Sequence, residues 1–211
     1  MNKLVLFNAA LRICGEGKLA SLSENRESRR VLDSMIEEGA LNHCLSQGMW
    51  RFATRTTKLV YYPSLETSFG LRYVFEEPED FCKTIALCND EYFNSPLLQY
   101  RHEAGFIYAD IQEIYFSYVS NHVDYGMDYE KWKPTFIQYV GHYLATGICE
   151  RMTQNESKYE KLFKLTKRYL TEAKSLEAWE EPTKFLPQGE WVSSRQGGRG
   201  NDFGNRNKLI G

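Results

Sequence analysis

The sequence predicts an α+β protein: mainly a helical bundle of about four helices, with a β-rich insertion between helices 2 and 3 and an extended C-terminal arm. Three observations lead to this expectation. Apolar residues recur with the 3.6-residue helical period on both sides of the middle of the chain. In the middle, Thr, Val, Tyr and turn residues replace that period. The last segment, Pro187–Gly211, shows neither period and includes six glycines among its 25 residues.

Composition and charge narrow the functional classes. A chain of 211 residues is expected to form one domain, or one domain with an insertion and a tail. The net charge of −2 gives no whole-chain argument for nucleic-acid or membrane binding. No apolar run approaches the length of a membrane span, and Asn8 and Arg12 interrupt the N-terminal apolar patch, so we expect neither membrane insertion nor a signal peptide. Five scattered cysteines without CxxC spacing indicate reduced thiols in a cytosolic setting.

Two helices are expected in the first fifty residues. The spacing of Leu4, Phe7, Leu11 and Cys14 predicts a short helix that Gly15 ends. We expect Ser23 to cap a longer second helix that runs to about Gln47. Its apolar positions are Val31, Leu32, Met35, Ile36, Leu41, Cys44, Leu45 and Met49.

From Arg51 to about Ser120 the chain is expected to form a small β-rich unit, because β-branched and aromatic residues alternate with turn residues. The expected strands are Phe52–Tyr62, Leu71–Phe75, Phe81–Leu87, Phe106–Ala109 and Glu113–Val119. A loop, Asn121–Asp128, is expected after them. The resulting division has residues 1–50 and 129–180 in the helical bundle, 51–128 in the β-rich insertion and 181–211 in the docking arm.

Helical periodicity returns at Pro134, a residue well suited to the first turn of a helix. A last helix is expected from about Ser157 to Trp179, and Pro182 ends it. The apolar face of the first of these two helices comprises Phe136, Ile137, Val140, Tyr143, Leu144, Ile148 and Met152. That of the last helix comprises Tyr159, Leu162, Phe163, Tyr169, Leu170, Ala173 and Leu176.

Candidate catalytic and metal motifs are incomplete. Gly15-Glu16-Gly17-Lys18 lacks the spacing of a phosphate-binding loop and follows an expected helix, so a helix end and a turn are the preferred interpretation. His102-Glu103 opens like a zinc-protease motif, but the second histidine is replaced by Phe106. Asp124, Asp128 and Glu130 are interpreted as a solvated turn. The sequence therefore predicts no catalytic, cofactor or metal residue.

The arm allows two interpretations. Arginines interleaved with glycines and aromatics are typical of a nucleic-acid-binding segment, and this is the alternative function. Apolar anchors separated by flexible glycines instead suit a groove on a protein, and fully extended the segment would span up to about 85 Å. The residues expected to dock on a portal or on a neighbouring subunit are Trp191, Val192, Arg195, Arg199, Phe203, Arg206, Lys208, Leu209 and Ile210.

Several segments resemble one family. They are Leu6–Arg12, Gly15-Glu16, Leu19–Glu27, Arg29–Asp33, Cys44–Gly48, Trp50–Ala53, Asp90–Phe93, Ser120-Asn121, Tyr125-Gly126, Trp191-Val192, Gly197–Arg199, Asn205-Arg206 and Leu209–Gly211. In these segments the chain resembles the tail tubular protein A family, the head-to-tail adaptors or gatekeepers of short-tailed bacteriophages. The resemblance covers most of the chain; it is specific in the first fifty and last 25 residues and loose through the β-rich insertion. Gly17-Lys18 and His122 depart from the family pattern.

The resemblance implies a structural virion protein and not an enzyme. Members of that family form a dodecameric ring under the portal protein, at one vertex of the capsid. The ring joins the portal to the tail nozzle, tail tubular protein B, and lines the channel through which genomic DNA leaves without sequence-specific binding. The implied location is the phage tail, after synthesis in the bacterial cytoplasm, and no cofactor is implied. C-terminal segments are expected to reach the portal, where many weak arms together bind strongly.

Overall fold

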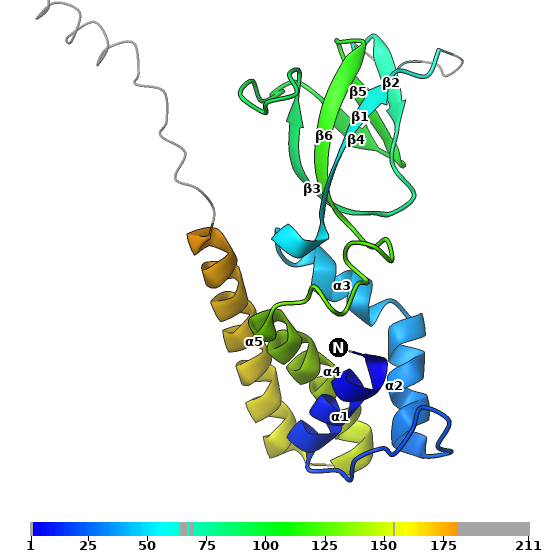
Figure 1. Cartoon of the computed structure of the whole chain (residues 1–211), viewed down its shortest axis with the longest axis vertical. Helices are drawn as coiled ribbons and strands as arrows, with labels where there is room; N and C mark the ends of the chain where they lie inside the picture. Colours follow the sequence, from blue (N-terminus) through cyan, green and yellow to red (C-terminus); the bar gives the residue numbers. More distant parts are fainter. Residues whose placement is uncertain (1, 64–66, 68–69, 154, 181–211) are drawn as a thin grey trace, which may run out of the picture. The chain divides into compact units, whose positions relative to one another are not determined.

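The computed structural model describes residues 2–63, 67, 70–153 and 155–180, and within them the chain is a mixed α+β protein (Figure 1). The helices are α1 (Lys3–Cys14), α2 (Glu27–Glu37), α3 (Ala40–Ser46), the 3-10 helix η1 (Arg51–Ala53), α4 (Pro134–Thr153) and α5 (Glu156–Trp179). The strands are β1 (Thr54–Val60), β2 (Tyr73–Glu76), β3 (Phe81–Cys88), β4 (Arg101–Glu103), β5 (Phe106–Ala109) and β6 (Glu113–Ser120). Contacts divide the chain into Met1–Trp179 and Glu180–Gly211, and these helices and strands all belong to the first unit. No helix within the described ranges is long and apolar enough to cross a membrane.

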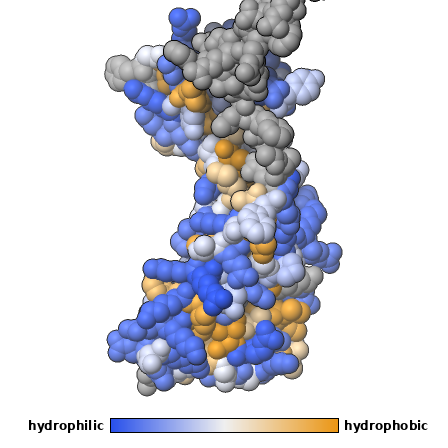
Figure 2. Space-filling view, turned by 90° about the vertical axis from the view of Figure 1, so that its left-hand side faces the viewer, coloured by the Kyte–Doolittle hydropathy of each residue, from blue (hydrophilic) through white to orange (hydrophobic). Residues whose placement is uncertain are grey.

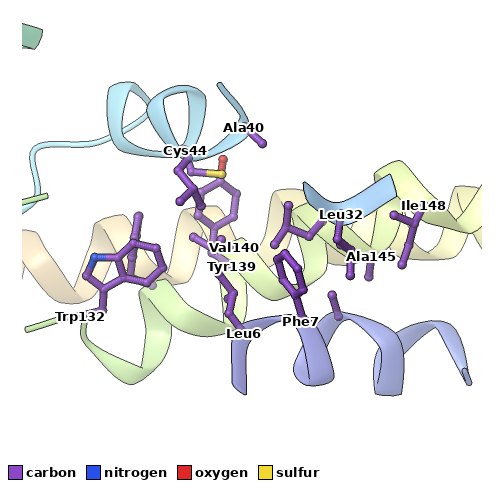
Figure 3. Close-up of a cluster of buried hydrophobic side chains, with 14 of the residues drawn as sticks. Leu6, Phe7, Leu32, Ala40, Cys44, Trp132, Tyr139, Val140, Ala145 and Ile148 are labelled. Carbon is purple, nitrogen blue, oxygen red and sulfur yellow. The ribbon is translucent and has the colours of Figure 1, made fainter. Parts of the chain in front are cut away.

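Helix α4 is the central element of the helical part, because α1, α2, α3 and α5 all contact it. Figure 3 shows the resulting core, in which Phe7 of α1, Leu32 of α2 and Cys44 of α3 surround Val140 of α4. All four side chains are fully buried. Burial of side chains of this size stabilises the fold by about 1.5–3 kcal/mol each, so this core supplies the main stabilisation of the helices.

The ends of α1 are fixed by local hydrogen bonds. The Asn2 side chain accepts a hydrogen bond from the Val5 amide at 3.0 Å, which satisfies one free amide of the first turn. At the other end, Gly15 adopts the left-handed conformation expected of a glycine cap, with φ of 76°. Lys158 of α5 donates a hydrogen bond to the Cys14 carbonyl and so satisfies a free carbonyl of the last turn. The end of α1 at Gly15 is therefore as the sequence predicts.

The long second helix predicted from Ser23 to Gln47 is wrong in two ways. Ser23 does not cap it: α2 begins at Glu27, and the capping position, Arg26, makes no side-chain capping bond. The chain then breaks at Gly39, whose φ of 93° is left-handed, so that α2 and α3 are separate helices. The apolar period runs through this break, which is why periodicity alone did not reveal it.

The strands form two antiparallel sheets in the described residues, in the orders β1-β6-β3 and β2-β5-β4. The predicted strand Phe52–Tyr62 begins too early, because the first residues form η1, in which the Ala53 amide donates to the Trp50 carbonyl at 3.0 Å. Strand β4 was missed in the sequence, since its three residues are all exposed and show no alternation.

The two sheets enclose a second hydrophobic core, separate from that of the helices. The Tyr62 amide donates to the Val74 carbonyl at 2.7 Å, which continues the pairing from the end of β1 onto β2. On the other side, the ring of Phe81 in β3 meets His102 in β4 edge-on, with centroids 5.3 Å apart. The buried residues of this core are Phe75, Leu87, Ile107, Ala109, Ile114, Phe116 and Tyr118.

Candidate docking surface

The predicted docking residues of the arm lie outside the described residues. They are Trp191, Val192, Arg195, Arg199, Phe203, Arg206, Lys208, Leu209 and Ile210. Their docking role therefore stays a prediction. The candidate surfaces that the structure does describe all belong to Met1–Trp179.

The acidic loop before α4 forms a hydrogen-bonded turn. Asp128 lies 3.1 Å from the Lys131 ammonium and accepts a hydrogen bond from the Glu130 amide at 3.0 Å. The hydrogen bond to Lys131, followed by that from the Glu130 amide, lowers the pKa of Asp128. Asp124 is exposed and lies 3.4 Å from His122. A lowered pKa favours the charged carboxylate, which is the state of a solvated turn and not of a general acid near neutral pH.

The other candidate motifs lie apart from one another. Gly15 ends a helix, and the carbonyls of Gly17 and Lys18 accept hydrogen bonds from Arg26, so this segment is a turn held to the start of α2. His102 forms a 2.6 Å contact with Glu77 across the second sheet. No group of three or more metal-ligating side chains is found in the described parts of the chain.

The cysteines are free thiols, as the scattered pattern indicates. Burial raises the pKa of Cys14 and of Cys44 to about 12, and that of Cys82 to about 11. Cys14 also donates a hydrogen bond to the Ala145 carbonyl at 3.1 Å. Thiols with such pKa values are almost entirely protonated at neutral pH and are therefore weak nucleophiles.

Asp80, next to β3, is the centre of a polar network at one end of the first sheet. Its carboxylate accepts hydrogen bonds from Ser120 at 2.5 Å and from Tyr118 at 2.9 Å. Its backbone carbonyl accepts a third from the Asn121 amide at 2.9 Å. The hydroxyl of Ser120 in turn accepts from the His122 amide at 3.0 Å. The bonds from Ser120 and Tyr118 tie Asp80 to β6, and those from Asn121 and His122 tie the loop after β6 to the sheet, so the network is best explained as structural.

An aromatic groove lies between α3, α4 and α5, with a volume of about 390 Å³. We call the part of α5 that borders it the Phe163 flank, comprising Tyr159, Phe163, Lys167 and Leu170. Phe163 is 44% exposed and its ring lies 4.3 Å from the Lys167 ammonium. Opposite, Tyr143 of α4 stacks on His43 of α3 at 5.1 Å. Figure 2 faces the side on which α5 lies and shows apolar patches interrupting the polar surface.

The other side of α5 carries a second shallow hollow, of about 510 Å³. We call this surface the Trp179 flank, comprising Arg168, Glu172, Leu176 and Trp179. Trp179 is 82% exposed and Leu176 is 39% exposed. Large apolar side chains exposed next to one another mark protein interaction sites more often than isolated ones do.

A third exposed apolar region lies on the loop between β3 and β4. Leu98 is 87% exposed and Tyr92 is also largely exposed. The loop has a defined shape, because Asp90 accepts hydrogen bonds from the amides of Asn94 at 3.0 Å and Ser95 at 2.8 Å. It therefore presents apolar side chains on an ordered turn.

The sequence did not identify the exposed residues of α5 as surface. It placed Tyr159, Phe163 and Leu176 in the core-facing stripe together with Leu162 and Ala173. In the structure Leu162 and Ala173 are buried, whereas Tyr159, Phe163 and Leu176 are partly exposed. A signal was present, because the apolar positions of α5 cover a much wider arc than the ~100° that one core contact needs.

No protein-family model matches the chain, and neither does any curated protein sequence.

Proposed function

We propose that the chain is a structural subunit of a virion: the adaptor that forms a ring between the portal of a short-tailed bacteriophage and its tail nozzle. The proposal assigns it no catalytic role and places it at the portal vertex, where the ring lines the channel for DNA. In this proposal the helices form a bundle around α4, the strands form an insertion into that bundle, and the segment 181–211 is an arm that docks on the portal. The resemblance of the first fifty and last 25 residues to the tail tubular protein A family motivates it.

The observation that carries this proposal is the exposure of large apolar side chains on both flanks of α5. Phe163, Leu176 and Trp179 are all exposed beyond a third of their surface. Stable protein contacts are enriched in aromatic side chains at their centres. A subunit that contacts copies of itself on two sides needs such surfaces on two sides.

The charge on the solvent-facing side of α5 indicates whether this side could line the proposed DNA channel. Its exposed cations are Lys161, Lys164, Lys167, Arg168 and Lys174, against the exposed acids Glu156, Glu160 and Glu172. A basic lining would hold the DNA phosphates and slow its passage. We therefore expect an acidic or neutral channel lining, formed by a face other than the solvent-facing side of α5.

Removal of the arm tests the proposal. A chain lacking Pro187–Gly211 is expected to keep its far-ultraviolet circular dichroism and its thermal transition, because both hydrophobic cores lie within Met1–Trp179. It is expected to lose co-sedimentation with purified portal rings, whereas the full chain co-sediments. A full-length variant with Tyr92→Ala serves as the control for an exposed aromatic elsewhere. Undiminished co-sedimentation of the truncated chain would refute the docking role.

A second candidate function is nucleic-acid binding through the arginine- and glycine-rich arm. The excess of exposed Lys and Arg on α5 is the structural observation that favours it. Such binding would be independent of sequence and would weaken steeply with salt. A filter-binding titration with duplex DNA and with RNA at low and at physiological salt decides the matter, since absence of binding at low salt removes this candidate.

A further inference from the structure

The aromatic groove between α3, α4 and α5 is lined by rings from all three helices. Tyr143 of α4 stacks on His43 of α3, with ring centroids 5.1 Å apart. On α5 the rings of Tyr159 and Phe163 are nearly parallel, with an interplanar angle of 13°. These four rings border one hollow of about 390 Å³. Protein sites for small organic compounds have volumes of roughly 300–1,000 Å³ and are lined mainly by apolar and aromatic side chains. The hollow therefore has the size and the lining of a site for a compound of one or two rings.

The only charge on the described lining of the groove is a cation. The ammonium of Lys167 lies 4.3 Å from the ring centroid of Phe163 and forms no ion pair with another described residue. The side chain of Lys167 is exposed, so this charge lies at the mouth of the groove. None of the described lining residues is an acid. An anionic group on a bound ring would gain a charge-assisted contact there.

The deeper polar groups of the groove are the hydroxyls of Thr146 in α4 and Thr166 in α5, which are 9% and 8% exposed. Thr146 donates to the His142 carbonyl at 2.8 Å and Thr166 to the Leu162 carbonyl at 2.9 Å. The two hydroxyl oxygens also lie 3.0 Å apart. Each hydroxyl has one hydrogen and two acceptor positions. Both hydrogens are thus engaged, whereas most of the acceptor capacity of the two oxygens is free, so this end of the groove favours a hydrogen-bond donor.

We propose that the groove binds a small aromatic anion. The planar ring system lies against the rings of Tyr143 and Phe163, its carboxylate lies at the Lys167 ammonium, and a hydroxyl at its other end donates to Thr146 or Thr166. Charge complementarity at Lys167 and the free acceptors at the two threonines together define this chemistry. The inference goes beyond the proposed function and does not depend on it.

Three naphthalene derivatives test the inference on the unmodified full-length protein, because they differ only in the two polar groups. The compound 6-hydroxy-2-naphthoate carries both, 2-naphthoate lacks the hydroxyl, and uncharged 2-naphthol lacks the carboxylate. Isothermal titration calorimetry is expected to give a Kd of about 1 mM or tighter for 6-hydroxy-2-naphthoate. We expect the Kd of each of the other two to be about fivefold weaker. Because Gly147 lines the groove, its amide resonance is expected to shift on binding in NMR spectra.

Two substitutions locate the polar contacts. Lys167→Met keeps an unbranched side chain without the charge, and is expected to weaken 6-hydroxy-2-naphthoate about fivefold and to leave 2-naphthol unchanged. Thr166→Val removes a hydroxyl at nearly constant shape, and is expected to weaken 6-hydroxy-2-naphthoate and to leave 2-naphthoate unchanged. Lys164→Met is the matched control, since Lys164 lies on the same helix, does not line the groove and is 3.9 Å from Glu160. Circular dichroism verifies the fold of each variant.

Several results would overturn the inference. One is the absence of binding by 6-hydroxy-2-naphthoate at several millimolar. Another is equal affinity for the three compounds, because binding would then depend on the rings alone. Equal losses from Lys164→Met and Lys167→Met, or amide shifts in the strands without a shift at Gly147, would place the compound outside the groove. Co-sedimentation with portal rings is measured without these compounds, so the proposed function is tested separately.

Discussion

The guanidinium of Arg55 in β1 donates a 2.8 Å hydrogen bond to the carboxylate of Asp80, which precedes β3. The same guanidinium lies 5.5 Å from the ring centre of Tyr125 in the loop after β6. Arg55 therefore links two strands and the loop that leads back to the helices. Arg55 balances the charge of the Asp80 carboxylate, which also accepts hydrogen bonds from the hydroxyls of Tyr118 and Ser120.

Stability should depend on the ionisation of Asp80. Burial raises its pKa, but hydrogen bonds from Ser120, Arg55 and Tyr118 outweigh this effect, and the net pKa is lowered. A lowered pKa means that the carboxylate stabilises the folded state above its unfolded pKa of about 4, and that this contribution is lost as the pH falls through the folded pKa. Asp80→Asn should therefore cost about 1–3 kcal/mol at pH 7 and clearly less at pH 3, measured by urea unfolding.

Asp124→Asn is the control for Asp80→Asn, since Asp124 is exposed and lies outside this network. It should change stability by less than about 0.5 kcal/mol at either pH. The same loss for Asp80→Asn at pH 7 and pH 3 would show that its charge contributes nothing.

Two glycines should respond differently to substitution by alanine. A Cβ on Gly126 would lie 2.1 Å from the Ser120 carbonyl oxygen, which is backbone of the strand end and has little freedom to move. A Cβ on Gly147 of α4 would lie 2.2 Å from the terminal methyl of Met35, which is able to change rotamer. We expect Gly147→Ala to cost about 1 kcal/mol and Gly126→Ala about 3 kcal/mol or more. Equal shifts in urea midpoint at unchanged slope would contradict this order.

The fold was predictable where structure is decided locally. Gly15 ends α1 because the left-handed conformation at a helix end favours glycine, and that signal is contained in a few residues. Gly39 also adopts the left-handed conformation and separates α2 from α3. The apolar period continues through Gly39, so periodicity alone does not predict this break. Strand β4 could not be found, because its exposed residues are defined only by their pairing with β5. Local sequence does not encode such a pairing.

The candidate surface was less predictable than the fold. Periodicity shows that Phe163 and Leu176 are apolar and share a helix with Ala173. It does not show which of them the rest of the chain covers, since that depends on the positions of α3 and α4. The docking residues that the sequence did favour, from Trp191 to Ile210, lie outside the described residues.

The thiols should be unreactive in the folded protein. Burial raises the pKa of Cys14 and Cys44 to about 12, so at pH 8 only about one molecule in ten thousand carries the reactive thiolate at either position. Alkylation with iodoacetamide followed by mass spectrometry should therefore modify these two residues slowly in buffer and completely in 6 M guanidinium chloride. Cys82, which is only partly buried, is the internal comparison and should react before them. Rapid labelling of Cys14 in buffer would show that α1 opens locally.

Glu177, near the end of α5, is a buried acid with a specific structural role. Its side chain is only 6% exposed. One oxygen accepts a hydrogen bond from the Arg51 amide at 3.2 Å, and the other lies 3.0 Å from the Lys133 ammonium. The carboxylate thus joins η1 and the segment before α4 to α5. Loss of one partner of a buried ion pair costs up to about 3–5 kcal/mol, and less when the other partner is partly solvated, as Lys133 is.

We therefore expect Glu177→Ala to lower the free energy of unfolding by about 2–3 kcal/mol and Glu177→Gln by about half as much, because glutamine keeps an acceptor for the Arg51 amide. Glu160→Gln is the matched control: Glu160 lies on the same helix, is largely exposed, and is 3.9 Å from Lys164. It should cost less than about 0.5 kcal/mol. Urea unfolding followed by tryptophan fluorescence measures all three variants, since Trp50 and Trp132 are both buried. If Glu177→Ala were no more costly than Glu160→Gln, the link between α5 and the start of the β-rich part would not stabilise the fold.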